Sequence, residues 1–327
     1  MVAERAIELN KIYHEDCLDF MGGLEKEQQP PLLVDVIVTS PPYNINKEYG
    51  HYHDDKEEKE YLDWLYQVAK KSLSILKDNG SFFLNIAGIP SDQFLPLDVA
   101  KTFKDAGYKL QNTIHWIKSI SFEEEDIAKS NGTARNNHDN HYDNNSSGFA
   151  VGHFKPIVSQ RFLTDCHEYI FHFTKNADVK LDKLAIGVPY QDKTNIGRWK
   201  SARQDRRDRG NTWFIPYPTI NESRPHPAVF PEKLPFLCIK LHGIRDDLLV
   251  YDPFMGTGTT ALACLKLNIN YLGTEIDEEY IKIARENIVQ LKNFIEREKN
   301  EHDKAKKIID WVSTTTSEED TEVVGER

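Results

Sequence analysis

The chain has 327 residues, and its 39% hydrophobic and 28% charged content fits a soluble globular protein with one large core or a core carrying a sizeable insertion. No apolar run approaches the length of a membrane span, and the first residues lack the apolar stretch of a signal peptide. The net charge of −11 argues at first against a nucleic-acid partner, but it is uneven, because 313–327 is acidic and 198–209 is basic.

In chain order, the first 118 residues alternate between strand and helix patterns. Short apolar, β-branched runs predict strands at 11–14, 34–39, 81–87 and 111–117. Apolar residues at spacings of three and four predict helices after Glu15-Asp16, from Lys56 to the stop at Asp78-Asn79-Gly80, and near 96–106. This alternation is typical of a parallel, doubly wound sheet.

The pattern weakens after Ser119, where 130–148 predicts a mobile loop and 210–218 an irregular segment. Between them, 162–175 predicts a strand, in which Glu168 and His172 are interpreted as structural residues. From His226 the alternation resumes, with a helix at 231–241, a strand at 248–254, a helix at 259–267, a strand at 270–276 and a helix from 278 to about 309.

Cysteine and histidine positions do not favour a metal centre. The four cysteines are scattered, with no CxxC pair: Cys17, Cys166, Cys238 and Cys264. This pattern predicts a reduced, cytoplasmic protein without a structural zinc site. His138 and His141 lie in the predicted mobile loop, where nothing rigid would hold them as ligands, so no metal is expected.

The stretch LLVYDPFMGTGTT, 248–260, predicts a buried strand, a glycine turn and a helix start. Gly256 and Gly258 let the backbone approach a ligand closely, and the free N–H groups of the helix attract an anion. Glu275, at the end of the next strand, can accept both hydroxyls of a ribose. A nicotinamide dinucleotide and S-adenosylmethionine both carry a ribose, but Asp252-Pro253-Phe254 is not expected of a dinucleotide site.

The stretch VIVTSPPY, 36–43, ends a buried strand at a rigid corner, because two prolines remove two backbone donors. A proline carbonyl and the Ser40 hydroxyl can accept hydrogen bonds from an exocyclic amino group, which frees the nitrogen lone pair for methylation. Tyr43 can stack on a base that has left the helix stack. A simple rigid turn or a WW-type ligand is the alternative, but the corner follows a buried strand.

Taken together, Thr39-Ser40-Pro41-Pro42-Tyr43 and Asp252-Pro253-Phe254-Met255-Gly256-Thr257-Gly258-Thr259-Thr260 resemble the DNA amino-methyltransferases that act on cytosine N4 or adenine N6. The catalytic motif precedes the glycine loop, which is the beta-class order. The resemblance covers roughly residues 7 to 300, with further matches at Asp16-Cys17, 76–81, 114–118 and 226–231.

The resemblance implies a Rossmann-like S-adenosylmethionine-dependent methyltransferase fold. Its α/β core would be a seven-stranded, mainly parallel sheet with circularly permuted motif order and an inserted target-recognition region. The implied domains are a catalytic half at 1–118, a recognition region with a flexible loop at 119–225, a cofactor-binding half at 226–311 and a disordered acidic tail at 312–327.

The same resemblance assigns site residues. Ser40, Pro41, Pro42 and Tyr43 would form the catalytic corner that holds and stacks the base. S-adenosylmethionine would be bound by Asp16 and Cys17 near its adenine, Glu275 at its ribose, Thr259 and Thr260 at its carboxylate, and also by Thr39, Pro227, Phe230, Asp252, Pro253, Phe254, Gly256 and Gly258.

Ser-Pro-Pro-Tyr is usual in this family for cytosine N4, whereas Asp-Pro-Pro-Tyr is usual for adenine N6, so Ser40 favours cytosine and adenine stays the alternative. Double-stranded DNA would be contacted by Arg198, Lys200, Arg203, Arg206, Arg207 and Arg209, unless these form a solvated charged face. The expected protein is a cytoplasmic monomer or homodimer without a membrane partner, with a cognate restriction endonuclease as a possible partner. A non-catalytic DNA-binding module would leave the glycine loop unexplained.

Overall fold

The structure of the protein is a computed structural model, in which the chain is described over most of its length. The described residues are 6–26, 31–44, 56–123, 148–152, 157–191, 193, 196, 205–216 and 229–319. Within them, no helix is long and apolar enough to cross a membrane.

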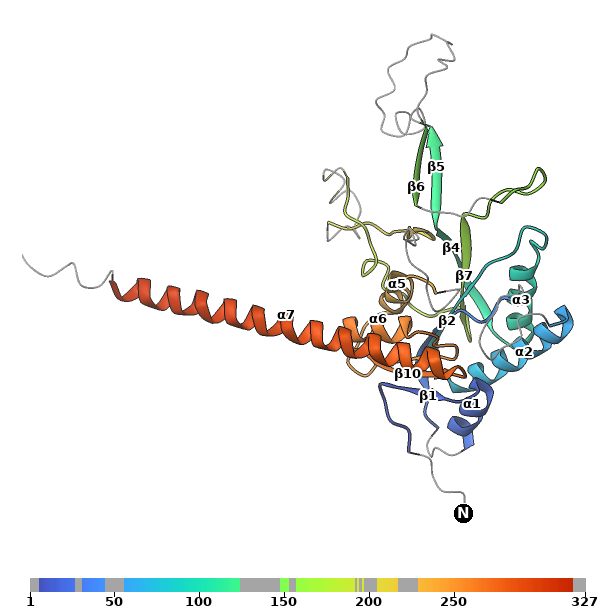
Figure 1. Cartoon of the computed structure of the whole chain (residues 1–327), viewed down its shortest axis with the longest axis horizontal. Coiled ribbons are helices and arrows are strands. Elements are labelled where there is room, and N and C mark those ends of the chain that lie inside the picture. The colour runs from blue at the N-terminus through green and yellow to red at the C-terminus, as the bar shows by residue number, and fades with distance from the viewer. Residues whose placement is uncertain are drawn as a thin grey trace, which may run out of the picture.

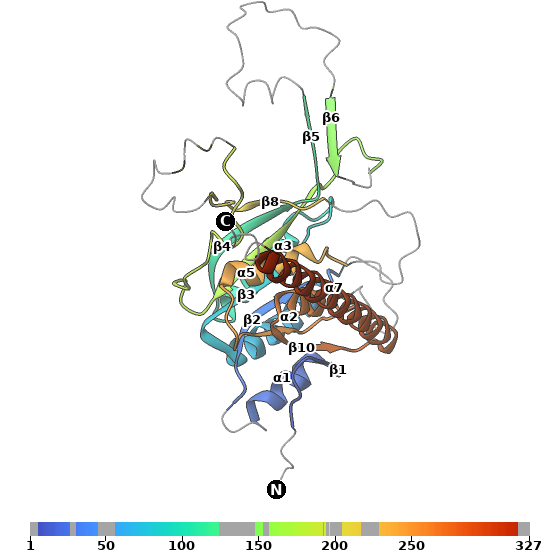
Figure 2. The ribbon, with the colours of Figure 1, turned by 90° about the vertical axis from the view of Figure 1, so that its left-hand side faces the viewer.

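Eight strands form one central sheet in the order β1-β10-β9-β2-β3-β7-β4-β8 (Figures 1 and 2). Every neighbouring pair is parallel except for β7, which runs antiparallel to both β3 and β4. The strands are β1 (Lys11–His14), β2 (Val34–Thr39), β3 (Leu76–Ile86), β4 (Lys109–Ile117), β7 (His167–Thr174), β8 (Thr212–Phe214), β9 (Leu249–Asp252) and β10 (Asn270–Glu275). The mainly parallel Rossmann-like sheet is therefore confirmed.

Helices cover both faces of the sheet (Figure 1). On one face, α1 (Cys17–Lys26), α2 (Glu58–Ile75) and α3 (Leu95–Asp105) share a core with the sheet. On the other face, α5 (Lys233–His242), α6 (Thr259–Leu267) and α7 (Glu278–Glu319) build a second core. Strand β2 is buried throughout and contributes side chains to both cores, because Ile37 faces the first core while Val36 and Val38 face the second.

The permuted order of the motifs is visible in the sheet. The first strand, β1, pairs with the last, β10, so the first and last strands of the chain lie side by side at one edge of the sheet. In the middle, β9 from the last third of the chain pairs with β2 from the first, at Val36↔Val250 and Ile37↔Tyr251. The carboxyl ends of β2 and β9 consequently lie side by side, at the position where open α/β sheets bind ligands.

The structure corrects several expectations. The strand count of seven was one too low, because Thr212–Phe214 adds β8 beside β4 within the segment expected to be irregular. The predicted recognition region, 119–225, supplies β7 and β8 to the central sheet and so is interleaved with the core. Helix α7 continues to Glu319, so 312–319 is helical instead of disordered, and 320–327 lies outside the described residues.

A second small sheet was also unexpected. Strands β5 (Ser119–Glu123) and β6 (Gly148–Gly152) form an antiparallel ribbon, which both views show extending away from the central sheet (Figures 1 and 2). The predicted mobile loop, with His138 and His141, lies between these strands and outside the described residues, apart from Gly148. Finally, α2 ends at Ile75 and β3 begins at once, so 78–80 belongs to a strand instead of ending the helix.

Candidate active site

Asp252, the last residue of β9, connects the two motifs at the centre of the sheet. Its Oδ1 accepts the Thr39 hydroxyl at 2.6 Å and the Phe254 N–H at 3.0 Å, and its Oδ2 accepts the Thr260 hydroxyl at 2.6 Å. All three donors come from different parts of the site: the end of β2, the turn after β9 and the first turn of α6. Asp252 therefore holds the site together from inside.

The Asp252 carboxylate is buried, and burial raises its pKa to about 6 despite the hydrogen bonds from Thr260 and Thr39. Thr39 and Thr260 are buried as well. These three residues were expected to line the cofactor site, but their polar side-chain atoms bind one another. Their geometry supports an indirect role, in which they set the shape of the loop that would meet the cofactor.

The glycine loop is fixed to the end of β10 by its own backbone. The Met255 N–H donates to the Thr274 carbonyl at 2.9 Å, and the Gly256 N–H donates to Glu275 Oε2 at 2.8 Å. Gly258 precedes α6 with a φ of 91°, and a Cβ there would lie 3.0 Å from the Cβ of Ala284. Both the left-handed backbone and the close approach of α7 therefore require glycine at 258.

Glu275 ends β10 beside the first strand of the chain. Its Oε1 accepts the N–H groups of Ile276 and Asp277, and burial raises the pKa of its carboxyl group. His14 pairs with Glu275 in the sheet, so the predicted adenine-side residues, Asp16 and Cys17, follow directly at this edge. Asp16 Oδ1 accepts the Leu18 N–H at 2.8 Å, whereas Cys17 is buried in the core.

The start of α6 fits an anionic group. No side chain caps this helix, so its first N–H groups remain the donors that would meet a carboxylate. The Thr260 hydroxyl already donates to Asp252, so a carboxylate would reach backbone N–H groups there, with Thr259 beside them. Together with the carboxylate of Glu275 for a ribose, this donor and acceptor set matches S-adenosylmethionine.

The corner after β2 is held by aromatic residues of α2. The Tyr61 hydroxyl donates to the Pro42 carbonyl at 2.7 Å. Tyr61 packs against Trp64, and the Trp64 ring in turn packs against Phe254 of the glycine loop, with ring centroids 5.5 Å apart. Helix α2 thus contacts both motifs, which places the predicted base-holding corner and the glycine loop on one support.

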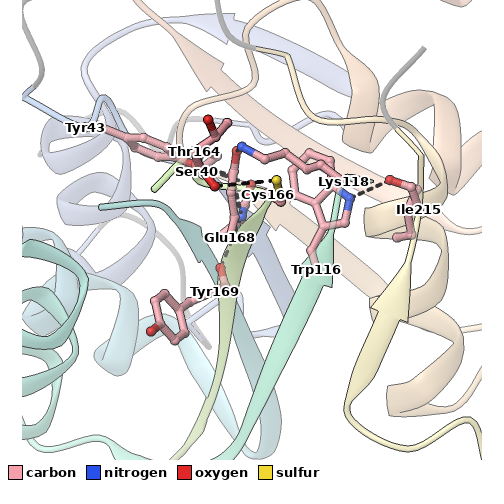
Figure 3. A network of polar contacts seen from close by, with 10 residues as sticks. Ser40, Tyr43, Trp116, Lys118, Thr164, Cys166, Glu168, Tyr169 and Ile215 are labelled. Atoms are coloured by element: carbon pink, nitrogen blue, oxygen red, sulfur yellow. Dashed lines mark hydrogen bonds and ion pairs between the residues drawn. The ribbon is translucent and has the colours of Figure 1, made fainter. Parts of the chain in front are cut away.

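The corner also reaches a polar network on β3, β4 and β7 (Figure 3). The Ser40 hydroxyl donates to the Tyr43 oxygen at 2.8 Å, and the Tyr43 hydroxyl lies 3.0 Å from Glu168 Oε2. Asn85 Nδ2 donates to the same Glu168 oxygen at 3.0 Å, and Lys118 Nζ lies 3.2 Å from Oε1. Glu168, expected to be structural, is therefore in contact with the catalytic corner.

The antiparallel direction of β7 explains why Glu168 reaches this position. In a parallel strand, the last residues would lie at the catalytic edge of the sheet. Because β7 is reversed, its first residues lie there, and Glu168 pairs with Trp116 near the carboxyl end of β4. A carboxylate near the start of this predicted strand was the available signal, but its use depended on the strand direction.

The predicted DNA-contacting residues are described only in part. Arg198, Lys200 and Arg203 lie outside the described residues. In the predicted cofactor set, Pro227 also lies outside them, whereas Phe230 packs against the core that α5, α6 and α7 build. Arg206 Nη1 donates to the Gly187 carbonyl at 2.9 Å and Arg209 Nε to the Ile186 carbonyl at 2.8 Å, while Arg207 pairs with Val188 through its backbone. Burial lowers the pKa of Arg209. These three arginines thus hold one loop together, and their contact with DNA stays a prediction.

Comparison with known proteins places this geometry in a family. The family of DNA methylases of the N6 and N4 type matches residues 34–286, which include both the corner and the glycine loop. The type II methyltransferase M.BglII of Bacillus subtilis is 28% identical over 288 residues, covering 84% of this chain and 68% of that protein. The DNA adenine methyltransferase YhdJ of Escherichia coli K12 is 26% identical over 282 residues, covering 85% of this chain and 82% of that protein.

Among solved structures, the PvuII DNA methyltransferase, described as cytosine-N4-specific, superposes with a TM-score of 0.55 at 20% identity. The match covers 86% of this chain and 91% of that one, and it supports the fold. The family match spans most of the chain and contains the motifs that meet at the carboxyl ends of β2 and β9. The chain therefore belongs to the N6/N4 DNA methylase family and is an S-adenosylmethionine-dependent DNA methyltransferase.

Proposed function

We propose that this chain methylates the exocyclic N4 amino group of cytosine in a short duplex DNA sequence, after the base has been flipped out of the helix. The observation that carries the proposal is the Ser40 hydroxyl at the corner, directed toward the Tyr43 oxygen at 2.8 Å. Its one proton is used there, so its lone pairs are available to accept a hydrogen bond from an amino group.

The corner offers a second acceptor. The Pro42 carbonyl is engaged by the Tyr61 hydroxyl, so we assign the base-facing role to the Pro41 carbonyl. Two acceptors on the amino hydrogens favour a pyramidal nitrogen whose lone pair can attack a methyl group. The ring of Tyr43 would stack on the base, as required for a nucleotide taken out of the duplex.

When bound, S-adenosylmethionine supplies a methyl group on a sulfonium, whose sulfur leaves as a neutral thioether while the methylated amino group releases one proton. Glu275 would accept the ribose hydroxyls, the uncapped start of α6 would receive the carboxylate, and Asp16 and Cys17 would border the adenine. The protein's contribution is then chiefly to place the amino nitrogen in line with the methyl group. Thr39 and Asp252 fix this spacing, because their hydrogen bond joins the corner to the loop.

Adenine N6 is the second candidate, because the similar YhdJ protein is an adenine methyltransferase, whereas the PvuII enzyme is cytosine-specific. Ser40 in place of an aspartate favours cytosine. We further propose that the enzyme works in the cytoplasm as part of a restriction-modification system, in line with its free cysteines and with the type II relative M.BglII.

The test is to express the chain in a host lacking DNA methyltransferases and to analyse its DNA. Enzymatic digestion to nucleosides and chromatography should yield N4-methylcytosine, and long-read sequencing should place it in one short motif. N6-methyladenine in place of N4-methylcytosine would overturn the cytosine assignment. DNA without either base, together with labelled S-adenosylmethionine that is bound but not used, would overturn the proposed reaction.

A further inference from the structure

We propose that Glu168 is a positioning residue that sets the direction of the hydrogen bonds at the catalytic corner. Glu168 accepts the proton of the Tyr43 hydroxyl, and the Tyr43 oxygen then accepts the proton of Ser40. The Ser40 oxygen is therefore left to accept a hydrogen bond from the amino group of the base, and cannot donate one to it. The inference rests on the proposed methyl transfer at Ser40, and it holds for either amino group. It adds a residue that lies outside both motifs, more than a hundred positions from Ser40 in the sequence.

The direction follows from counting donors. Asn85 Nδ2 donates to Glu168 Oε2 and to the Tyr169 carbonyl at 3.0 and 3.1 Å, which identifies its Oδ1 as the acceptor end of the amide. The Tyr43 hydroxyl therefore faces two acceptors, Glu168 Oε2 at 3.0 Å and Asn85 Oδ1 at 3.3 Å. Whichever of them takes its proton, the Tyr43 oxygen can only accept from Ser40.

The surroundings of Glu168 keep the direction of the hydrogen bond from Ser40 to Tyr43 fixed. Its side chain is only 14% exposed, and that of Lys118 is 21% exposed, so water competes little for their 3.2 Å ion pair. The three supporting side chains come from three adjacent strands: Asn85 from β3, Glu168 from β7 and Lys118 from the residue after β4. Because a carboxylate has no hydrogen to donate, its two oxygens can only accept from Lys118, Asn85 and Tyr43.

The exchange of Glu168 for glutamine tests the direction without changing the shape. Lys118 would attract the amide oxygen, which turns the amide NH₂ group toward Tyr43 and Asn85. The Asn85 amide would turn over in response, so that its oxygen accepts from the new NH₂ group and its own NH₂ group replaces the second acceptor that faces Tyr43. Tyr43 would then donate to Ser40, and the Ser40 proton would point at the amino group of the base. We expect Glu168→Gln to lower kcat by about 10- to 100-fold, the equivalent of one hydrogen bond to a charged group, with unchanged binding of DNA and S-adenosylmethionine.

A second variant separates direction from packing. In the double variant Lys118→Met with Glu168→Gln, nothing attracts the amide oxygen away, so it can turn toward Tyr43 and Asn85 again. At saturating DNA, kcat of the double variant should exceed that of Glu168→Gln alone. A residue with only a structural role would show the opposite, a further loss when its ion-pair partner is removed.

Asp78→Asn is the matched control, because Asp78 also pairs with a lysine, Lys175 at 3.1 Å, at the opposite end of the β3 and β7 pair. Its kcat should equal that of the wild type. A methylating wild type with an unimpaired Glu168→Gln variant, or a double variant slower than the single one, would overturn the inference alone. A wild type that binds DNA and cofactor but transfers no methyl group would overturn the proposed function itself.

Discussion

The two halves of the site are stabilised in different ways. The glycine loop is held mainly by its neighbours at the ends of β9 and β10, through Asp252, Thr274 and Glu275. The catalytic corner is held by side chains distant in sequence, Tyr61 of α2 and the Glu168 network of β3, β4 and β7. Apart from the contacts of Asp252 with Thr39 and of Phe254 with Trp64, the loop is thus held within one segment of the sequence, whereas the corner depends on the assembled sheet.

This difference predicts that substitutions in the loop and at the corner have different effects on the enzyme. Changes within residues 252–275 should remove cofactor binding and stability together, because the same contacts provide both. Changes around the corner should reduce turnover while cofactor binding survives. The strand β7 is the critical element for the corner, since it comes from the predicted recognition region and lies between β3 and β4.

The largest effect is expected for Asp252→Ala in the glycine loop. The change leaves the buried hydroxyls of Thr39 and Thr260 and the Phe254 N–H without their acceptor. The free energy of unfolding should fall by about 3 kcal/mol or more, and calorimetry should detect no binding of S-adenosylmethionine. Asp247→Ala, at an exposed carboxylate paired with Arg245, should cost under about 0.5 kcal/mol. Wild-type cofactor affinity in Asp252→Ala would refute the organising role.

Acid should weaken the support of the corner before it weakens the loop. Asn112 Nδ2 donates to His172 Nδ1, and a buried chain continues through Ser81 to His242 Nδ1. This chain joins β4, β7, β3 and α5, and it requires both rings to be neutral. Burial lowers the pKa of His172 to about 3 and that of His242 to about 4, from the 6.5 of an exposed ring.

The unfolded chain therefore takes up these protons first as the pH falls. The stabilisation that the neutral His172 and His242 give to the folded state is complete above pH 6.5 and is lost toward pH 4. Over this range the free energy of unfolding falls by about 1.4 kcal/mol per pH unit for each histidine. Asp252 behaves oppositely, because its raised pKa of about 6 makes its burial less costly in acid. Hydrogen exchange at pH 5 should show loss of protection in β7 and β4 before β9. Simultaneous loss in all three strands would contradict the predicted difference in acid sensitivity between the corner and the glycine loop.

Gly258→Ala should have an intermediate effect on the glycine loop. The substitution forces an alanine into a φ of 91° and places its Cβ 3.0 Å from that of Ala284. We expect a loss of about 1–2 kcal/mol from the backbone alone and a further loss from crowding, with weaker cofactor binding. Gly210→Ala is the control, because its φ is 74° but nothing lies within 4 Å of the added Cβ. Equal destabilisation of both variants in urea unfolding would show that the contact with α7 is unimportant.

The sequence predicted the local half of the site better than the distributed half. The bounds of α6, Thr259–Leu267, and of β2, Val34–Thr39, agree with expectation, because Gly258 marks the start of α6 and two prolines follow the end of β2. The pairing of β9 with β2 places both motifs together, as the motif order implied. These features depend on neighbours in the sequence or on repeated apolar patterns.

What the sequence did not reveal depends on tertiary pairing. Strand β8 has only three residues and is defined by its pairing with β4, such as Trp116↔Trp213. The role of Glu168 depends on the reversed direction of β7, which no pattern in 162–175 indicates. Thr260 was expected to meet the cofactor, but its hydroxyl is turned toward Asp252 by a contact that only the folded loop creates.

The smallest expected effect tests whether the corner can be weakened alone. Tyr61→Phe removes the 2.7 Å hydrogen bond to the Pro42 carbonyl while the ring stays against Trp64. The loss of one neutral hydrogen bond, about 0.5–1.5 kcal/mol, should lower kcat by about 2- to 10-fold and leave cofactor affinity unchanged. Tyr108→Phe removes a comparable buried bond, to Ser72, far from the catalytic edge, and should reduce stability but not kcat. If Tyr61→Phe instead weakened cofactor binding, α2 would support both motifs through this residue, and the corner would not be separable from the loop.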